Sequence, residues 1–315
     1  MNADILSTQI EQGRLKDSGD FPKVVLIDTV SYCNLACAMC VHPAMTRKKG
    51  VMSWNLFTKI IDEVASENKH ARVWMVFFGE PFVIKNRNPS IFDMIRYAKD
   101  KGLTDVVTNS NANLMDEDAA RKLIGSGLDA IYFGLDAFSP ETYAQIRIKG
   151  DYAKVVKNIQ YLLKLKEEMK SDKPEVFVQF VEMDNNINEK EPFISFWSEQ
   201  GAKVKIRPKV SWAGLIEARN LVLGDADRWP CYWAMQTISI TDTGKVVTCA
   251  VDLDARYIAG DITTENLKDV WNGTLKELRQ LHIEKKFVEL PEICRNCKDW
   301  QSARADYYQA EIENL

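Results

Sequence analysis

The sequence has few histidines, no excess of basic residues and no long apolar run. Only 3 histidines occur among 315 residues, and none lies in a patterned site, so nothing supports histidine-based acid–base catalysis. The 41 Lys and Arg residues are offset by 45 Asp and Glu residues. A protein that binds nucleic acid needs a basic face, so this balance argues against a nucleic-acid partner. No glycine-rich phosphate loop is present.

The N-terminus and the apolar runs predict a cytoplasmic protein without a membrane partner. No run approaches the ~18 apolar residues that span a membrane, and the polar N-terminus lacks the apolar core of a secretory signal. A hydrophobic fraction of 46% and a charged fraction of 27% are typical of a globular chain. Its length suggests about two domains.

Strand and helix patterns alternate along the first two thirds of the chain. Short β-branched apolar runs predict strands, and amphipathic runs predict helices, with caps expected at Ser53, Ser139 and Asn188. Six such repeats predict right-handed βαβ units in a parallel sheet, two repeats short of a closed eight-stranded barrel. We therefore expect an α/β fold, a partial (β/α)6 barrel of the TIM type. The predicted strands are 24–30, 72–78, 105–108, 130–135, 175–183 and 203–207, and the predicted helices are 53–68, 90–102, 116–127, a helix opened by 139–141, 152–170 and 188–200.

The pattern changes after about residue 210. Residues 237–241 and 245–249 predict a β-hairpin in which Gly244 takes the positive φ of the turn. A single helix is expected over about 266–281. The predicted organisation is a lead-in at 1–22, the partial barrel at 23–210 and a smaller domain at 211–315. We expect Trp212, Trp229 and Trp233 to pack at the junction.

Seven cysteines fall into two groups. In a reducing compartment disulfides are rare, and an odd number cannot all pair. An isolated cysteine is often a small buried apolar residue, but clustered thiols at these spacings indicate metal ligands. The first group is Cys33, Cys37 and Cys40; the second is Cys231, Cys249, Cys294 and Cys297.

The first group has the spacing CxxxCxxC and follows the first predicted strand. Three thiolates satisfy three irons of a four-iron cluster and leave the fourth iron open. A structural zinc ion is the alternative, but it needs a fourth ligand. His42 is the one candidate nearby, and we expect it to be a loop residue that faces solvent.

This motif and its strand resemble the radical S-adenosylmethionine (SAM) superfamily over about residues 24–208. The resemblance implies that Cys33, Cys37 and Cys40 hold a [4Fe-4S] cluster and that SAM chelates the open iron. It further implies reductive cleavage of SAM to a deoxyadenosyl radical, which takes a hydrogen atom from a substrate. The cluster would be reduced by an external donor such as flavodoxin or ferredoxin.

Phe78-Gly79-Glu80-Pro81 resembles the GGEP element of that family, although Phe78 stands where the first glycine is usual. The resemblance implies that the backbone at Gly79 and the carboxylate of Glu80 receive the methionine ammonium. Without the family, Glu80 is a carboxylate at the end of a strand, fixed by Pro81. A loop-capping acid is the alternative interpretation.

Further strand ends carry polar residues in the order that the resemblance requires. Asn109, Ser110 and Asp136 lie where the family binds ribose hydroxyls or the SAM carboxylate. Arg147 resembles the arginine that pairs with that carboxylate, since a guanidinium fork suits a carboxylate. The alternative is an exposed helical arginine without such a contact.

Two apolar side chains are expected near the adenine. Met39 occupies the position where many family members have an aromatic residue, and a thioether can make the same apolar contact. Val181, on the fifth predicted strand, is the second expected neighbour.

The second group resembles the opening of the SPASM domain, which binds auxiliary iron–sulfur clusters. A complete SPASM domain has three more cysteines after the CxxC pair, and here no cysteine follows Cys297. The remainder resembles a truncated or "twitch" type with one auxiliary [4Fe-4S] cluster. A zinc site made by the same four thiolates stays open as an alternative.

The architecture is similar to the aminocyclitol dehydrogenase of butirosin biosynthesis. It predicts oxidation of a secondary alcohol on a sugar or aminocyclitol, with the auxiliary cluster as electron acceptor. If Cys249 is not a ligand, it could instead act as the hydrogen donor of a carbohydrate or aminoglycoside epimerase. A SPASM-type peptide maturase and a non-catalytic iron–sulfur or zinc scaffold are further alternatives. The candidate substrate contacts are Arg207, Lys209, Trp212 and Asp252.

Overall fold

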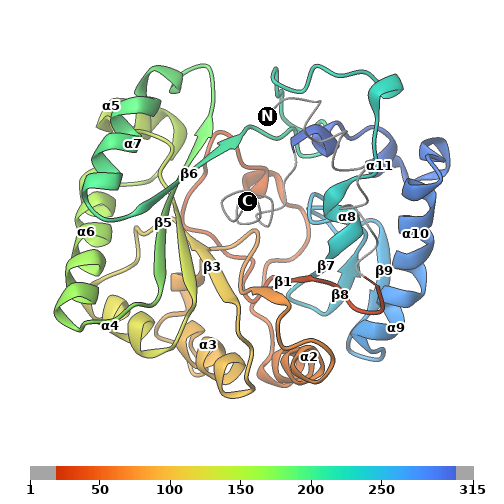
Figure 1. The fold of residues 1–315 in the computed structure, drawn as a ribbon, viewed down its shortest axis with the longest axis horizontal. Helices are drawn as coiled ribbons and strands as arrows, with labels where there is room; N and C mark the ends of the chain where they lie inside the picture. Colours follow the sequence, from red (N-terminus) through yellow and green to blue (C-terminus); the bar gives the residue numbers. More distant parts are fainter. Residues whose placement is uncertain (1–18, 303–315) are drawn as a thin grey trace.

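The computed structural model describes residues 19–302 (Figure 1). In this part of the chain the strands form one nine-stranded sheet in the order β6-β5-β4-β3-β2-β1-β7-β8-β9. The strands β1 to β6 pair in parallel, which is the predicted partial barrel. The strands are β1 (Val24–Ile27), β2 (Arg72–Trp74), β3 (Val106–Ser110), β4 (Ala130–Gly134), β5 (Glu175–Glu182), β6 (Lys203–Pro208), β7 (Thr237–Ile240), β8 (Lys245–Val247) and β9 (Ile258–Asp261).

The helices of the barrel start where capping side chains satisfy free backbone N–H groups. Ser53, Ser90, Asp116, Ser139 and Asp151 each accept a hydrogen bond from the N–H three residues later. Helices α3, α4, α6 and α7 lie on the outer side of the parallel strands, whereas α9 and α10 lie beside β7 to β9 (Figure 1). The helices are α2 (Trp54–Glu67), α3 (Ile91–Asp100), α4 (Glu117–Gly125), α5 (Pro140–Ile146), α6 (Tyr152–Glu168), α7 (Lys190–Glu199), α8 (Tyr232–Gln236), α9 (Leu267–Asn272), α10 (Thr274–Ile283) and α11 (Glu292–Arg295).

The C-terminal part continues the barrel's own sheet. Strand β7 pairs in parallel with β1, and β7 and β8 form the predicted antiparallel hairpin. Gly244 in its turn has a φ of +88°, as expected. Ile238, Ile240 and Trp271 belong to the same apolar core as the outer face of the barrel. The predicted domain boundary at 210/211 falls between β6 and α8 and stays a prediction.

Two local predictions were wrong, and one strand was missed. The expected helix over 266–281 is two helices, α9 and α10, because Gly273 between them has a φ of −92° and a ψ of −117°, outside the helical region. The expected Asn188 cap is absent, since α7 begins at Lys190 without a side-chain cap. Strand β9 was not expected; it pairs with β8 and extends the hairpin.

Side chains alternate across the barrel strands and separate two layers. On β5, Val176, Val178 and Phe180 belong to the outer core beneath the helices, whereas Phe177 packs with an inner cluster. In that cluster, Tyr132 stacks on Phe177 with ring centroids 4.5 Å apart. These aromatic rings fill the lower barrel, so a polar ligand must lie above them, at the carboxyl ends of the strands.

Among the described residues, no helix combines the length and the apolar character needed to cross a membrane.

Candidate active site

The first three cysteines lie together on the cysteine loop (residues 31–52) between β1 and α2, and all three are half-buried. Burial raises the pKa of Cys33 to about 12, and the nearby charges of Glu80, Cys37 and Cys40 add to the rise. Three thiolates this close repel one another unless a cation neutralises them. The loop therefore fits a cationic iron–sulfur group, whose binding releases the thiol protons.

Each sulfur of the cysteine loop has a hydrogen-bond donor beside it. Such N–H···S contacts tune iron–sulfur sites. The donor–sulfur distances are 3.9 Å from Asn111 Nδ2 to Cys33, 3.6 Å from Arg147 Nη1 to Cys37 and 3.4 Å from the His42 backbone N to Cys40. The sequence did not mark Asn111 or the His42 backbone for this role, because both contacts arise from tertiary folding.

His42 does not face solvent, so that prediction was wrong. A short 3-10 helix (His42–Ala44) turns its side chain inward, and the residue is buried. Its ring Nε2 lies 2.8 Å from the carbonyl oxygen of Ser31. The imidazole thus fixes the fold of the cysteine loop from within.

Gly79 lies where the end of β2 meets the cysteine loop. A Cβ atom on this residue would lie 1.8 Å from the carbonyl oxygen of Val30 and 2.9 Å from that of Tyr32. The Glu80 N–H also donates to the Tyr32 carbonyl at 2.8 Å. The backbone at Gly79 lies so close to the backbone of the cysteine loop that no side chain fits between them, so glycine is required here.

Phe78 fits in place of the usual first glycine because its side chain turns away into an aromatic group. Its ring centroid lies 4.6 Å from that of Phe77 and 5.8 Å from that of Trp212. The Trp212 indole N–H donates to the Met39 carbonyl at 2.9 Å. Trp212 therefore packs between the barrel and the cysteine loop, as expected of a junction residue.

Glu80 is buried and joins two strand ends. Its carboxylate accepts hydrogen bonds from Phe82 N at 3.1 Å, Ser110 Oγ at 2.9 Å and Asn111 N at 2.7 Å. Burial raises the pKa of Glu80 to about 7, although these hydrogen bonds oppose the rise. The observed contacts match those of a loop-capping acid. Reception of the methionine ammonium by Glu80 stays a prediction.

Asp136 and Arg147 form a buried ion pair at the end of β4. The Arg147 Nη2 atom lies 2.5 Å from Asp136 Oδ2, and the backbone N–H of Val181 donates to Asp136 Oδ1 at 2.8 Å. Asp136 has a φ of 62°, in the left-handed region that non-glycine residues rarely adopt. Burial works to lower the pKa of Arg147, but the charges of Asp136 and Cys37 outweigh it and the pKa rises. The interpretation of Arg147 as an exposed helical arginine is wrong.

The Arg147 guanidinium can occupy its position beside β4 because Gly134 has no side chain. A Cβ atom at Gly134 would lie 2.1 Å from Arg147 Nη2, so the guanidinium crosses the inner face of β4 at this residue. It thereby reaches from Asp136 to Cys37. This places a fixed cation beside the cysteine loop, where a ligand carboxylate could pair with it.

Two buried amides lack a hydrogen-bond partner on the inner side of the barrel. These atoms are Asn109 Oδ1 on β3 and Gln179 Nε2 on β5. Buried polar atoms are normally paired, so one free acceptor and one free donor point to a polar ligand. Lys205 on β6 is buried nearby, with its Nζ 5.0 Å from the ring centroid of Tyr132. Sequence reasoning missed Gln179 and Lys205, which the two-residue alternation of inward positions could have found.

The four C-terminal cysteines also come together. Burial raises the pKa of Cys294 to about 12, with the charges of Cys231 and Cys297 adding to it. Burial likewise raises the pKa of Cys297, with further contributions from Asp299, Cys231 and Cys249. Four mutually repelling thiolates fit a cationic iron–sulfur group as the first three do.

The second site borders the barrel. Cys231 and Cys249 pack against the inner cluster that holds Trp233, and Trp229 packs against Trp300 with centroids 4.5 Å apart. Trp233 thus packs against the barrel, as expected of a junction residue, whereas the contact of Trp229 lies within the C-terminal part. In the part of the chain that the structure describes, no three His, Cys, Asp or Glu side chains are arranged around a single metal ion. Ligands of a four-iron cluster bind its separate corners, so they need not converge on one point.

The expected substrate contacts do not all lie in one place. Asp252 is buried, and its carboxylate accepts the backbone N–H groups of Arg256 at 3.0 Å and Tyr257 at 2.8 Å. Arg207 lies on β6, and Lys209 lines a cavity of about 300 Å³ beyond it. Trp212 and Asp252 line the same groove of about 370 Å³, which Lys209 does not line. The structure thus brings two of the four expected residues together, and the roles of all four stay predictions.

Comparison with known proteins matches both cysteine groups to families. Residues 27–171 match the radical SAM superfamily, and residues 231–298 match the iron–sulfur cluster-binding SPASM domain. The chain thus contains a radical SAM domain followed by a SPASM domain. These domains imply its cofactors, which are a [4Fe-4S] cluster with SAM and an auxiliary iron–sulfur cluster.

Curated relatives cover parts of the chain. A tungsten-containing aldehyde ferredoxin oxidoreductase cofactor-modifying protein from Pyrococcus furiosus is 29% identical over 168 residues, which are 52% of this chain and 45% of that protein. A GTP 3′,8-cyclase from Desulforamulus reducens is 29% identical over 142 residues, 44% of this chain and 42% of that protein. The matched region thus spans less than half of the length of either relative.

Solved structures share the fold over most of the chain. Streptococcus suis SuiB bound to the precursor peptide SuiA has a TM-score of 0.69 at 12% identity, covering 93% of this chain and 74% of that one. BtrN in complex with AdoMet and 2-DOIA has a TM-score of 0.59 at 16% identity, covering 88% and 93%. The anSMEcpe protein with bound AdoMet has a TM-score of 0.61 at 18% identity, covering 92% and 94%. At these identities the likeness establishes the partial barrel with its SPASM domain.

We expect Gly134→Ala to weaken SAM binding by about ten- to a hundredfold, because hydrogen bonds to charged groups contribute about 1.5–3 kcal/mol. The new Cβ displaces the Arg147 guanidinium, whose flexible end can move without unfolding the barrel. Calorimetric titration of SAM into the reconstituted chain measures the effect. Gly224→Ala is the matched control, since a Cβ there meets no atom within 4 Å. Equal affinities for both variants would show that Arg147 does not hold the SAM carboxylate.

Proposed function

We propose that this radical SAM enzyme oxidises a secondary alcohol of a sugar or aminocyclitol to a ketone. When bound, the two clusters supply the electron that cleaves SAM and accept one electron from the substrate, which also loses a hydrogen atom and a proton. An external donor such as flavodoxin or ferredoxin would provide the first electron. The rest of the proposal concerns what the chain's own residues do.

The observation that carries the proposal is that Cys231 and Cys249 pack against the same inner cluster and both lie near Cys297. Cys249 is close enough for its charge to raise the pKa of Cys297, and Cys231 acts on both Cys294 and Cys297. Four thiolates can ligate all four irons of an auxiliary cluster. No C-terminal cysteine would then be left to return a hydrogen atom, which favours net oxidation over epimerisation.

The inner side of the barrel suits a hydroxyl-rich ligand. Asn109 Oδ1 can accept a hydrogen bond from a hydroxyl, and Gln179 Nε2 can donate one. The stacked rings of Tyr132 and Phe177 offer an apolar surface for the face of a sugar or cyclitol ring. Arg147 would hold the SAM carboxylate and so orient the deoxyadenosyl group above them, a role that its position beside Cys37 supports.

Epimerisation is the second candidate, and one contact favours it. Cys249 packs against the inner cluster of the barrel, the side from which a hydrogen donor would have to reach the substrate. If Cys249 were a free thiol, this position would suit the role. Its ligand status therefore separates the two functions.

Cys249→Ala tests the proposal directly. We expect anaerobically reconstituted protein to fall from about eight to about four irons per chain, because the auxiliary cluster loses a ligand. Thr248→Ala is the matched control, since the Thr248 hydroxyl has no hydrogen-bond partner and its loss should leave the iron content unchanged. Three thiolates can hold a four-iron cluster, as Cys33, Cys37 and Cys40 are expected to do, so the iron count is read together with the Mössbauer spectrum. About eight irons with a spectrum identical to that of the wild type would reject Cys249 as a ligand and favour the epimerase.

Product analysis in D2O with a panel of sugars and aminocyclitols is the second test. Dehydrogenation should consume about one SAM per ketone and place no solvent deuterium on the reacting carbon, because no hydrogen atom returns to it. An epimerase returns a hydrogen atom from an exchangeable thiol, so its product would carry one deuterium at that carbon. Deuterium there would contradict the oxidation proposal.

A further inference from the structure

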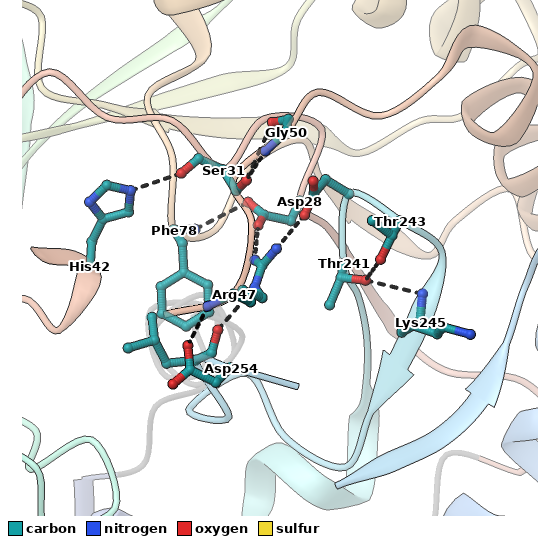
Figure 2. A network of polar contacts seen from close by, with 12 residues as sticks. Asp28, Ser31, His42, Arg47, Gly50, Phe78, Thr241, Thr243, Lys245 and Asp254 are labelled. Atoms are coloured by element: carbon teal, nitrogen blue, oxygen red, sulfur yellow. Dashed lines mark hydrogen bonds and ion pairs between the residues drawn. The ribbon is translucent and has the colours of Figure 1, made fainter. Parts of the chain in front are cut away.

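Arg47 is a nearly buried arginine on the cysteine loop, and its guanidinium contacts three separate segments. Its Nη2 lies 2.8 Å from Asp28 Oδ2, and its Nε donates to the carbonyl oxygen of Leu253 at 3.0 Å. Its Nη1 pairs with Asp242. Figure 2 shows the arginine between Asp28 and the segment that carries Asp254. One side chain thus joins segments that are far apart in the sequence.

These partners belong to both halves of the molecule. Asp28 follows β1, directly before the cysteine loop. Asp242 lies in the turn between β7 and β8, and Leu253 lies in the Cys249 loop (residues 248–257) between β8 and β9. The guanidinium therefore connects the loop that holds the first cysteines to the loop that holds Cys249.

Backbone contacts reinforce the same connection. Asp254 Oδ1 accepts the N–H of Thr46 at 2.7 Å and that of Arg47 at 3.0 Å (Figure 2). A Cβ atom at Gly50 would lie 2.5 Å from Asp242 Oδ2, so the cysteine loop lies directly against the β7–β8 turn. The cysteine loop therefore contacts both the Cys249 loop and the β7–β8 turn.

Asp28 extends this connection to the SAM-binding side. Its second oxygen, Oδ1, accepts the backbone N–H of Phe78 at 3.3 Å, one residue before Gly79. The Asp28 carboxylate and the Arg47 guanidinium thus link three segments. These are the segment that follows β2, the cysteine loop and the Cys249 loop.

Arg47 is the cation that two buried carboxylates share. The side chains of Asp28 and Asp242 are only 4% and 3% exposed, and the single guanidinium serves both. Burial raises the pKa of Asp28 to about 6, Arg47 opposes the rise and the charge of Asp242 adds to it. Removal of one partner from a buried ion pair is strongly destabilising, because the remaining charge is uncompensated.

We propose that Arg47 is a positioning residue that fixes the Cys249 loop and the β7–β8 turn against the cysteine loop, and so sets the placement of the auxiliary-cluster site relative to the SAM site. This placement is independent of the proposed oxidation. Its consequence for electron transfer between substrate and auxiliary site rests on that proposed function.

Hydrogen–deuterium exchange on the reconstituted full chain tests the placement. In Arg47→Met we expect backbone exchange at 241–244 and 249–257 to rise by on the order of a hundredfold, while β3 to β5 keep their wild-type protection. Arg256→Met is the matched control, because Arg256 lies in the same loop but is 73% exposed. It should leave the exchange pattern unchanged, and Arg47→Lys should restore part of the protection.

A neutralised variant keeps the test decisive if Arg47→Met folds poorly. In Arg47→Met/Asp28→Asn/Asp242→Asn no buried charge is left unpaired, yet the Leu253 carbonyl still lacks its donor. We expect this chain to fold with faster exchange confined to 249–257. Wild-type exchange in both this variant and Arg47→Met, or an equal rise throughout the sheet, would overturn the proposal.

In the loaded enzyme, displaced sites should uncouple SAM cleavage from product formation. The ratio of 5′-deoxyadenosine to ketone should rise above the wild-type value in Arg47→Met, whereas a merely less stable enzyme would lose both in proportion. A proportional loss would contradict the placement role. If the wild type makes no ketone from any substrate, the proposed function fails, and the exchange result still decides the placement.

Discussion

Replacement of Gly79 by alanine is expected to destabilise the fold by about 3 kcal/mol or more, because overpacking against an immobile neighbour costs more than a typical substitution. The new Cβ would lie 1.8 Å from the backbone carbonyl oxygen of Val30. Neither chain segment can yield easily, since the Glu80 N–H donates to Tyr32 and the Asp28 carboxylate accepts from Phe78 at the same junction.

Chemical denaturation of the reconstituted chain measures the effect of Gly79→Ala. Gly125→Ala is the control, because Gly125 lies at the end of α4 and a Cβ there meets no atom within 4 Å. The control should be neutral or more stable by up to about 1 kcal/mol, since alanine loses less conformational entropy on folding. Equal stability of the two variants would mean that the backbone at Gly79 does not contact Val30 and Tyr32 as described.

The largest expected effect on activity comes from Cys33→Ala/Cys37→Ala/Cys40→Ala. Formation of 5′-deoxyadenosine should fall below detection, because no thiolate remains to hold the cluster that SAM binds. The fold should survive, since these residues are half-buried. The cysteine loop that carries them is also held in place by the contacts of His42 and Arg47. Anaerobic incubation with SAM and dithionite, followed by chromatography, is the measurement.

Iron analysis of the same variant separates loss of the cluster from loss of the fold. About four irons should remain at the four C-terminal cysteines. Loss of all iron together with the native circular dichroism would indicate general unfolding. Residual SAM cleavage would contradict the assignment of these three cysteines.

The parts of the fold that local chemistry determines could be predicted from the sequence. Ser53 and Ser139 cap helices as expected, because a capping side chain acts within its own first turn. The hairpin turn at Gly244 could likewise be predicted, because it depends on the backbone conformation of that one residue. The break at Gly273 was missed, because glycine inside an amphipathic pattern can either stay in a helix or end it.

Tertiary contacts determine the parts that were missed. Glu189 stands at the cap position of α7, but its side chain does not cap the helix. Its carboxylate instead accepts the N–H groups of Phe138 and Ser139, about 50 residues away. Arg47 and Asp242 are 195 residues apart in the sequence. No local pattern indicates such partners.

The candidate site likewise has a part that local sequence motifs predicted and a part that depends on tertiary contacts. Motif spacing predicted both cysteine groups, and each converges in the structure. The ion pair of Arg147 with Asp136 and its dependence on Gly134 follow only from how α5 packs over β4. Gln179 has an ordinary place in a strand pattern, and only its unpaired buried amide marks it as a ligand contact.

The central claim is that one chain holds a SAM-binding cluster and an auxiliary iron–sulfur cluster. Iron, acid-labile sulfide and zinc in anaerobically reconstituted wild-type protein test it most directly. The account predicts about eight irons, about eight sulfides and no stoichiometric zinc per chain. About four irons together with about one zinc would show that the C-terminal thiols form a structural zinc site, and would contradict the auxiliary cluster and the oxidation that depends on it.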